Sequence, residues 1–247
     1  RSIRKSHSET FGISVEYVLS EAFTQICQRS TDKDDPTFYE ISNAIFLVND
    51  SIGKNTICPR DGEKGCSYLD TLAPEHKGVC THFLSWSWSY NLSVVQSGLR
   101  NFIEKEDLDA EDVYLWMCFF TNNQHRILNE SSKVKNGSDN LEEVFESNLL
   151  RIGKVVALLD TWIRPALLTR VWCIFEQYTA MRLGVEVYMI LPKASADTFI
   201  DQIEAGKVGI LHVKDNLSRV DSEHAKASMP ADEEKVKQLI KQGVGFD

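Results

Sequence analysis

Apolar and polar positions along residues 78–213 form a repeating pattern that predicts strand after helix. Short, continuous apolar runs, typical of strands buried on both faces, occupy residues 79–85, 113–120, 154–160, 185–192 and 208–213. Segments with the three- and four-residue spacing of amphipathic helices lie between them, at 92–106, 139–152, 169–184 and 195–206. The pattern predicts an α/β fold with a flavodoxin-like, doubly wound parallel sheet of about five strands.

The first 75 residues show a different pattern. Residues 11–28 place Val15, Leu19 and Phe23 on one stripe, which predicts an amphipathic helix whose apolar face packs on the sheet domain. We therefore expect a mainly helical N-terminal extension over residues 1–75. An α/β domain over residues 76–247 then follows, with a closing helix near its end at 230–242.

Polar and aromatic residues gather where the predicted strands end. Ligands of doubly wound sheets bind at the carboxyl ends of the strands. The candidate binding residues at these ends are Ser85, Trp86, Trp88, Asn123, His125, Asp160 and Trp162. For the two tryptophans of Ser-Trp-Ser-Trp, ordinary core packing and a place in a pocket wall are both open. A loop or cap role is equally open for His125. The polar character of residues 121–138 predicts one long loop.

One carboxylate stands in an apolar part of a predicted helix. Glu176 follows Ile174 and Phe175, and Trp172 lies four residues earlier on the same face. A glutamate that reaches solvent or pairs with Arg170 or Arg182 is one interpretation. The other is a carboxylate held in an aromatic pocket, where burial raises its pKa.

Composition narrows the classes of function. The net charge of −9 argues against nucleic acid as a partner, and no apolar run is long enough to cross a bilayer. No glycine-rich phosphate loop is present. The six cysteines predict free thiols in a reducing compartment, so we expect a cytoplasmic protein. Cys58, Cys66, Cys80 and His82 lack the close pairs of zinc sites, and we expect no metal.

Two stretches carry a resemblance to a known family. "HFLSWSW" (82–88) and "VVALLDTWIRPALLTRVWCIFEQYTA" (155–180) resemble the Toll/interleukin-1 receptor (TIR) domain, over roughly residues 78–220. Trp172 to Glu176 fits the W-x-x-x-E pattern of TIR domains that cleave NAD+. The three motifs "THFLSW", "NQH" and "TRVWCIFE" are, in this order, also similar to TIR-like modules of protists and algae. The loop at 121–138 departs from the receptor TIR pattern, which leaves the usual assembly contacts in doubt.

The resemblance implies an NAD+ glycohydrolase that acts in signalling, defence or cell death. It implies that Glu176 is the catalytic residue and that NAD+ is the substrate, with no separate cofactor. It also leads us to expect self-association through the domain. Arg170 or Arg164 would meet the pyrophosphate, and pairing with acidic residues at the surface is the other role open to these arginines. Trp172 and the strand-end residues named above would complete the substrate site. A non-catalytic adaptor that assembles with other proteins remains the alternative. A sensor that binds a nucleotide without turnover is a third hypothesis.

Overall fold

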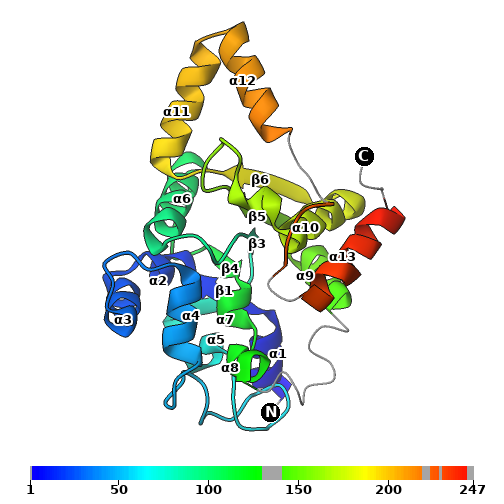
Figure 1. Ribbon diagram of the computed structural model, residues 1–247. Helices are drawn as coiled ribbons and strands as arrows, with labels where there is room; N and C mark the ends of the chain where they lie inside the picture. The colour runs from blue at the N-terminus through cyan, green and yellow to red at the C-terminus, as the bar shows by residue number, and fades with distance from the viewer. Residues whose placement is uncertain (1, 130–140, 219–222, 228–229, 244–247) are drawn as a thin grey trace.

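The computed structural model describes residues 2–129, 141–218, 223–227 and 230–243. Its centre is a mixed six-stranded sheet with strand order β2-β1-β4-β3-β5-β6 (Figure 1). The strands are β1 (Phe11–Ser14), β2 (Lys77–Val79), β3 (His82–Ser85), β4 (Tyr114–Trp116), β5 (Lys154–Leu158) and β6 (Glu186–Ile190). The α/β prediction is confirmed.

The parallel part of the sheet consists of β4, β3, β5 and β6. Strand β3 pairs with β4 on one side and with β5 on the other, and Leu84 lies opposite Val156. After β3 the chain therefore crosses first to β4 and then back to β5. This reversal of direction is the topological switch of a doubly wound sheet, beside which such folds bind ligands.

Helices enclose the sheet. They are α1 (Ser2–Thr10), α2 (Val15–Leu19), α3 (Glu21–Thr31), α4 (Phe38–Phe46), α5 (Tyr68–Thr71), α6 (Leu92–Lys105), α7 (Cys118–Thr121), α8 (Gln124–Asn129), α9 (Leu141–Ile152), α10 (Val171–Leu183), α11 (Lys193–Glu204), α12 (Lys207–Leu217) and α13 (Pro230–Gly243). Short 3₁₀ turns occupy Pro74–His76 and Ala166–Thr169. The helices predicted at 92–106, 139–152, 169–184, 195–206 and 230–242 are confirmed as α6, α9, α10, α11 and α13 to within a few residues.

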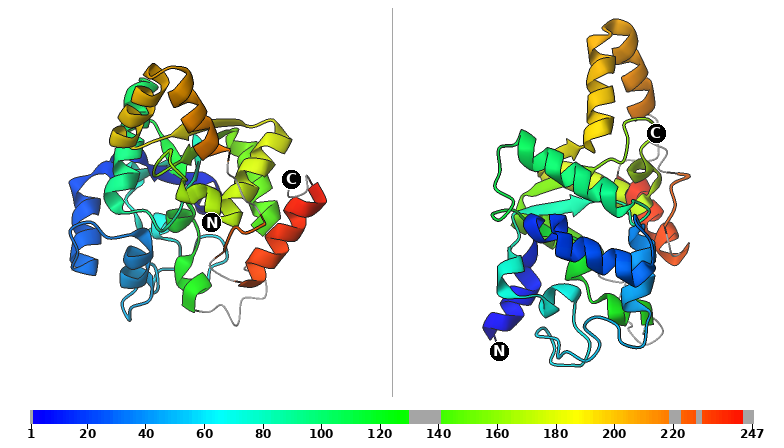
Figure 2. Two further views of the ribbon diagram at one scale, coloured as in Figure 1. Left: turned by 45° about the horizontal axis from the view of Figure 1, so that its top comes forward. Right: turned by 90° about the vertical axis from the view of Figure 1, so that its left-hand side faces the viewer.

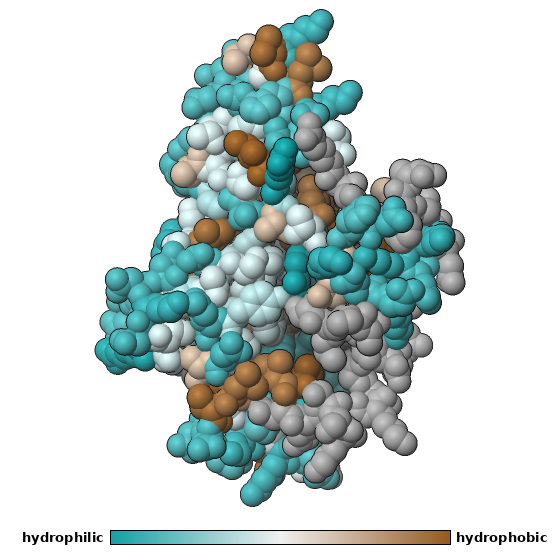
Figure 3. Space-filling model, viewed as in Figure 1, coloured by the Kyte–Doolittle hydropathy of each residue, from teal (hydrophilic) through white to brown (hydrophobic). Residues whose placement is uncertain are grey.

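The strand predicted at 208–213 is wrong, because this segment lies in α12. A short apolar run has the same appearance in a helix and in a buried strand, and here it pairs with α11 in a helical hairpin. The hairpin projects from the body of the protein, and apolar surface appears at its end (Figures 1, 2 and 3). Val208, 79% exposed, belongs to that surface.

The single helix predicted at 11–28 is also wrong, because β1, α2 and α3 replace it. Two serines begin the helices: Ser14 accepts a hydrogen bond from the Tyr17 backbone N–H, and Ser20 accepts one from that of Phe23. Strand β1 lies between β2 and β4 and is antiparallel to both. The predicted packing on the sheet domain is confirmed, since Phe23 lies 5.4 Å, centroid to centroid, from the Phe120 ring.

Two more predictions need correction near β4. The apolar run 113–120 is a strand only over residues 114–116, after which the chain turns into α7. The predicted loop 121–138 contains α8, and its remaining residues from 130 onward lie outside the described part of the chain. Phe119 and Phe120 of α7 instead enter the core.

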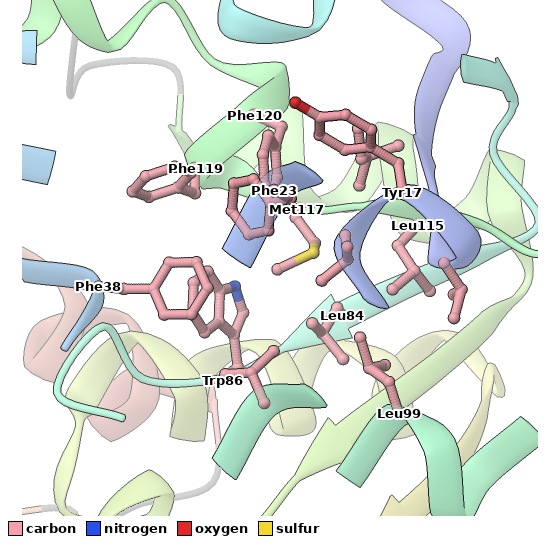
Figure 4. Close-up of a cluster of buried hydrophobic side chains, with 14 of the residues drawn as sticks. Tyr17, Phe23, Phe38, Leu84, Trp86, Leu99, Leu115, Met117, Phe119 and Phe120 are labelled. Atoms are coloured by element: carbon pink, nitrogen blue, oxygen red, sulfur yellow. The ribbon is translucent and has the colours of Figure 1, made fainter. Parts of the chain in front are cut away.

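The main hydrophobic core is continuous across residue 75. Phe38 of the N-terminal segment meets the Trp86 ring edge-on at 4.5 Å and the Phe119 ring at 5.2 Å, both measured between centroids (Figure 4). Leu84 and Leu115 of the central strands belong to the same cluster. Residues 1–75 therefore share their core with the domain that carries the parallel strands.

Two glycines offer a matched test of this packing. A Cβ on Gly12 of β1 would lie 2.4 Å from the backbone oxygen of Leu115, which the β1–β4 pairing holds in place. The three atoms nearest to a Cβ on Gly98 of α6 all belong to the Leu158 side chain, whose end can shift more readily than a backbone oxygen. We expect Gly12→Ala to lower the free energy of unfolding by about 2–3 kcal/mol. Gly98→Ala should change it by less than about 1 kcal/mol, because alanine favours the helix. Urea unfolding measures both, and equal losses would contradict the rigid contact.

Candidate functional site

A serine and a glutamate meet at the topological switch. Ser85 ends β3, and its Oγ donates a hydrogen bond of 2.5 Å to Glu176 Oε2. Glu176 comes from the middle of α10, 91 residues further along the chain. Ser85 is fully buried and Glu176 is only 8% exposed. The interpretation of Glu176 as a solvent-exposed residue is therefore wrong, and Arg182 pairs with Glu146 instead.

Burial sets the protonation of this carboxyl. Removal from water raises the pKa of Glu176 to about 8, although the hydrogen bond from Ser85 lowers it in part. The group is therefore mostly neutral at pH 7 and becomes a carboxylate in mildly alkaline solution. A carboxyl whose pKa is poised near neutrality is a common feature of catalytic sites.

Two thiols lie beside Glu176. The Cys173 Sγ–H donates to the Trp86 carbonyl oxygen over 3.4 Å, and Cys118 begins α7. Burial and, second to it, the nearby charge of Glu176 raise the pKa of both thiols, that of Cys118 to about 12. Both therefore stay neutral. The buried free thiol predicted for Cys173 is confirmed, and Cys118 is a partly buried free thiol.

The two tryptophans of the β3–α6 loop have different surroundings. Trp86 is 5% exposed and belongs to the core, beside Phe38 and Phe119. Its Nε1–H is buried and meets no hydrogen-bond acceptor in the described part of the chain. Trp88 is partly exposed and lies 5.3 Å from the Phe119 ring. The core interpretation therefore fits Trp86, while Trp88 keeps an accessible face close to Cys118.

Two predicted binding residues turn toward the N-terminal segment instead. Asn123 Nδ2 donates to the Gly65 carbonyl oxygen over 2.7 Å, and His125 Nδ1 lies 2.8 Å from Ser51 Oγ. These contacts attach α8 to the loop before α5. The structure does not bring Asn123 or His125 to Glu176.

Three further predicted residues have structural contacts. Asp160 Oδ1 accepts a hydrogen bond from the Ala166 N–H over 2.9 Å, which shapes the loop after β5. Trp162 Nε1 donates to Thr198 Oγ1 and lines a groove of about 520 Å³ along β6, on the hairpin side of the sheet. Trp172 packs on Phe145 at 5.5 Å between ring centroids. Their roles toward a substrate stay predictions.

Arg170 stands at the N-terminus of α10, where the helix dipole is positive. Its Cζ lies 5.9 Å from the ring centroid of Tyr39, a residue that sequence reasoning did not single out. No spacing could have indicated this contact, because the two residues are far apart in the chain and meet only in the fold. Ser85, Trp88, Arg170 and Glu176 are thus the predicted residues that the structure gathers.

Within the described residues, neither a metal-binding group nor a membrane-spanning helix is found. No group of three or more histidine, cysteine or acidic side chains there is arranged to hold a metal ion. Cys58 and Cys66 are buried free thiols. None of the described helices has the length and apolar character needed to cross a membrane.

Comparison of the chain with protein-family models, with curated proteins and with solved structures gives no significant match in any of the three.

Proposed function

We propose that this chain is a TIR-like NAD+ glycohydrolase, in which Glu176 is the catalytic residue. One observation carries the proposal. The carboxyl of Glu176 is buried, hydrogen-bonded to Ser85, and placed beside the topological switch among the parallel strands of the sheet. The type of reaction is inferred from the resemblance of residues 82–88 and 155–180 to TIR domains that cleave NAD+. A role in signalling or defence, with self-association of the domain, is part of the same proposal.

The chemistry suits a single carboxylate. Breaking the bond between nicotinamide and ribose builds positive charge on the sugar, as in glycoside cleavage. Ionised Glu176 would stabilise that charge in surroundings with little water, where an electrostatic contact is strong. Ser85 would orient the carboxylate through its hydrogen bond. Nicotinamide leaves as a neutral molecule, so the reaction needs no strong general acid.

The test is direct. Purified protein is incubated with NAD+ at low and at high protein concentration, because assembly can be required for activity. The products are then separated by chromatography. Free nicotinamide together with ADP-ribose or a cyclised product supports the proposal. If the assembled protein leaves NAD+ intact, the enzyme hypothesis is wrong and the result favours the non-catalytic adaptor.

The pH profile gives a further prediction. Since only ionised Glu176 stabilises the sugar cation, kcat/KM should rise about tenfold for each pH unit below the pKa of Glu176. It should level off above about pH 8, the pKa that burial gives this residue. Initial rates between pH 5.5 and 9.5 at low NAD+ concentration measure the profile. A rate that is already flat at pH 6 would contradict the assignment.

A further inference from the structure

The start of α4 braces the loop that carries Trp88. The Tyr39 N–H donates to the Trp88 carbonyl oxygen over 3.0 Å, and the Phe38 N–H donates to that of Tyr90 over 3.1 Å. Thr37 and Asn91 form an isolated antiparallel bridge beside them. Residues of the N-terminal segment therefore fix the backbone just after β3.

The Tyr39 side chain joins two groups that suit a nucleotide. Its ring centroid lies 6.0 Å from that of Trp88 at an angle of 61°, and the Arg170 guanidinium lies 5.9 Å from it. All three side chains are partly exposed, so each keeps surface that a ligand can reach. An indole face binds a planar cationic ring, and a guanidinium binds phosphate oxygens through paired hydrogen bonds.

Two of these groups belong to the segments that carry the proposed reaction centre, because Trp88 follows Ser85 by three residues and Arg170 caps the helix of Glu176. Arg170 directly precedes α10 and stands six residues before Glu176, about 9 Å along the helix axis. On the other side, the Trp88 ring packs on Phe119, the residue after Cys118, and the Cys118 thiol lies close enough to feel the charge of Glu176. In NAD+ the ribose likewise stands between a planar cationic ring and a pyrophosphate.

We propose that Tyr39 is a positioning residue that holds Trp88 for the nicotinamide ring and Arg170 for the pyrophosphate. The inference rests on the proposed NAD+ substrate, and it makes residues 1–75 part of the substrate site. Because ring and phosphate are held in the ground state as well as in the transition state, the loss of Tyr39 acts mainly on binding. The ring itself does not touch the reacting atoms.

The experiment separates binding from turnover. Kd for NAD+ is measured by calorimetry in a Glu176→Gln background, and KM and kcat are measured with Glu176 present. Tyr39→Ala should raise Kd and KM about tenfold and leave kcat within about threefold. Tyr39→Phe should restore both, because the ring remains. Tyr178→Ala is the matched control, since Tyr178 is also partly buried but packs on Phe175 at the other face of α10, and it should leave Kd unchanged.

Each outcome is decisive. If NAD+ is cleaved and Tyr39→Ala leaves Kd and KM unchanged, this inference is wrong and the proposed function stands. If NAD+ binds in a Tyr39-dependent way but the Glu176 protein does not cleave it, the inference stands and the glycohydrolase proposal is wrong. If the Glu176→Gln protein binds no NAD+, or Tyr178→Ala weakens binding as much as Tyr39→Ala, the inference is overturned.

Discussion

Replacing Glu176 by glutamine should reduce NAD+ turnover at least about a hundredfold. A neutral amide keeps the shape of the side chain and the hydrogen bond to Ser85, but it cannot offset the positive charge that develops on the ribose. An electrostatic contribution of this kind is worth about 3 kcal/mol. Single-turnover rates at pH 8.5, where Glu176 is mostly ionised, measure the effect. The control is Glu146→Gln, which removes a partly exposed carboxylate paired with Arg182 and should leave the rate unchanged.

The same substitution should make the fold more stable in alkaline solution. The folded-state pKa of Glu176, about 8, lies above the ordinary value of 4.5, so folding favours the protonated carboxyl. That stability is fully present below pH 4.5 and is lost as pH rises toward 8. Glutamine does not titrate, so over this pH range the free energy of unfolding of the variant should rise relative to that of the parent, by at most about 5 kcal/mol. A rate loss accompanied by lower stability at pH 8.5 would indicate misfolding instead of lost catalysis.

Deleting residues 1–75 should abolish cooperative folding. The deletion removes β1, which pairs with both β2 and β4, and uncovers the rings of Phe119 and Phe120. Burying one such large side chain is worth about 2–3 kcal/mol, and a domain has only about 5–15 kcal/mol of net stability. Circular dichroism and thermal unfolding measure the loss. Adding the 1–75 segment as a separate chain is the control, since it can restore the same contacts. A truncated protein that melts cooperatively within a few degrees of the full chain would contradict this prediction.

The sequence pattern was sufficient for three of the four parallel strands. It marked β3 and β5 as apolar runs because both are buried over nearly their whole length, and it marked β6 as well, although only Ile190 of β6 is buried. It failed at 208–213, where the same apolar run packs as a helix, and at 11–28, where Ser14 and Ser20 divide the segment by capping two helices. Helical spacing alone does not show where a cap interrupts it.

The candidate site was predictable only in part. The proximity of Ser85 and Glu176 could be predicted, because both were assigned to elements that meet at one edge of the sheet. Asn123 and His125 were assigned to the same edge, but a turn into α7 after β4 redirects them to the loop before α5. The contact of Tyr39 with Trp88 depends on how the N-terminal segment packs, and local sequence carries no information on that.

The position of β1 also shapes how the protein is made. Ile13 pairs with Lys77 and with Leu115, so its second partner leaves the ribosome about a hundred residues later. At about 5–20 residues per second, β1 waits at least several seconds for β4, its second neighbour in the sheet. During that time the side of β1 that β4 will cover stays open. The nascent chain therefore exposes an apolar segment over this interval, and chaperones that shield emerging chains would protect it there.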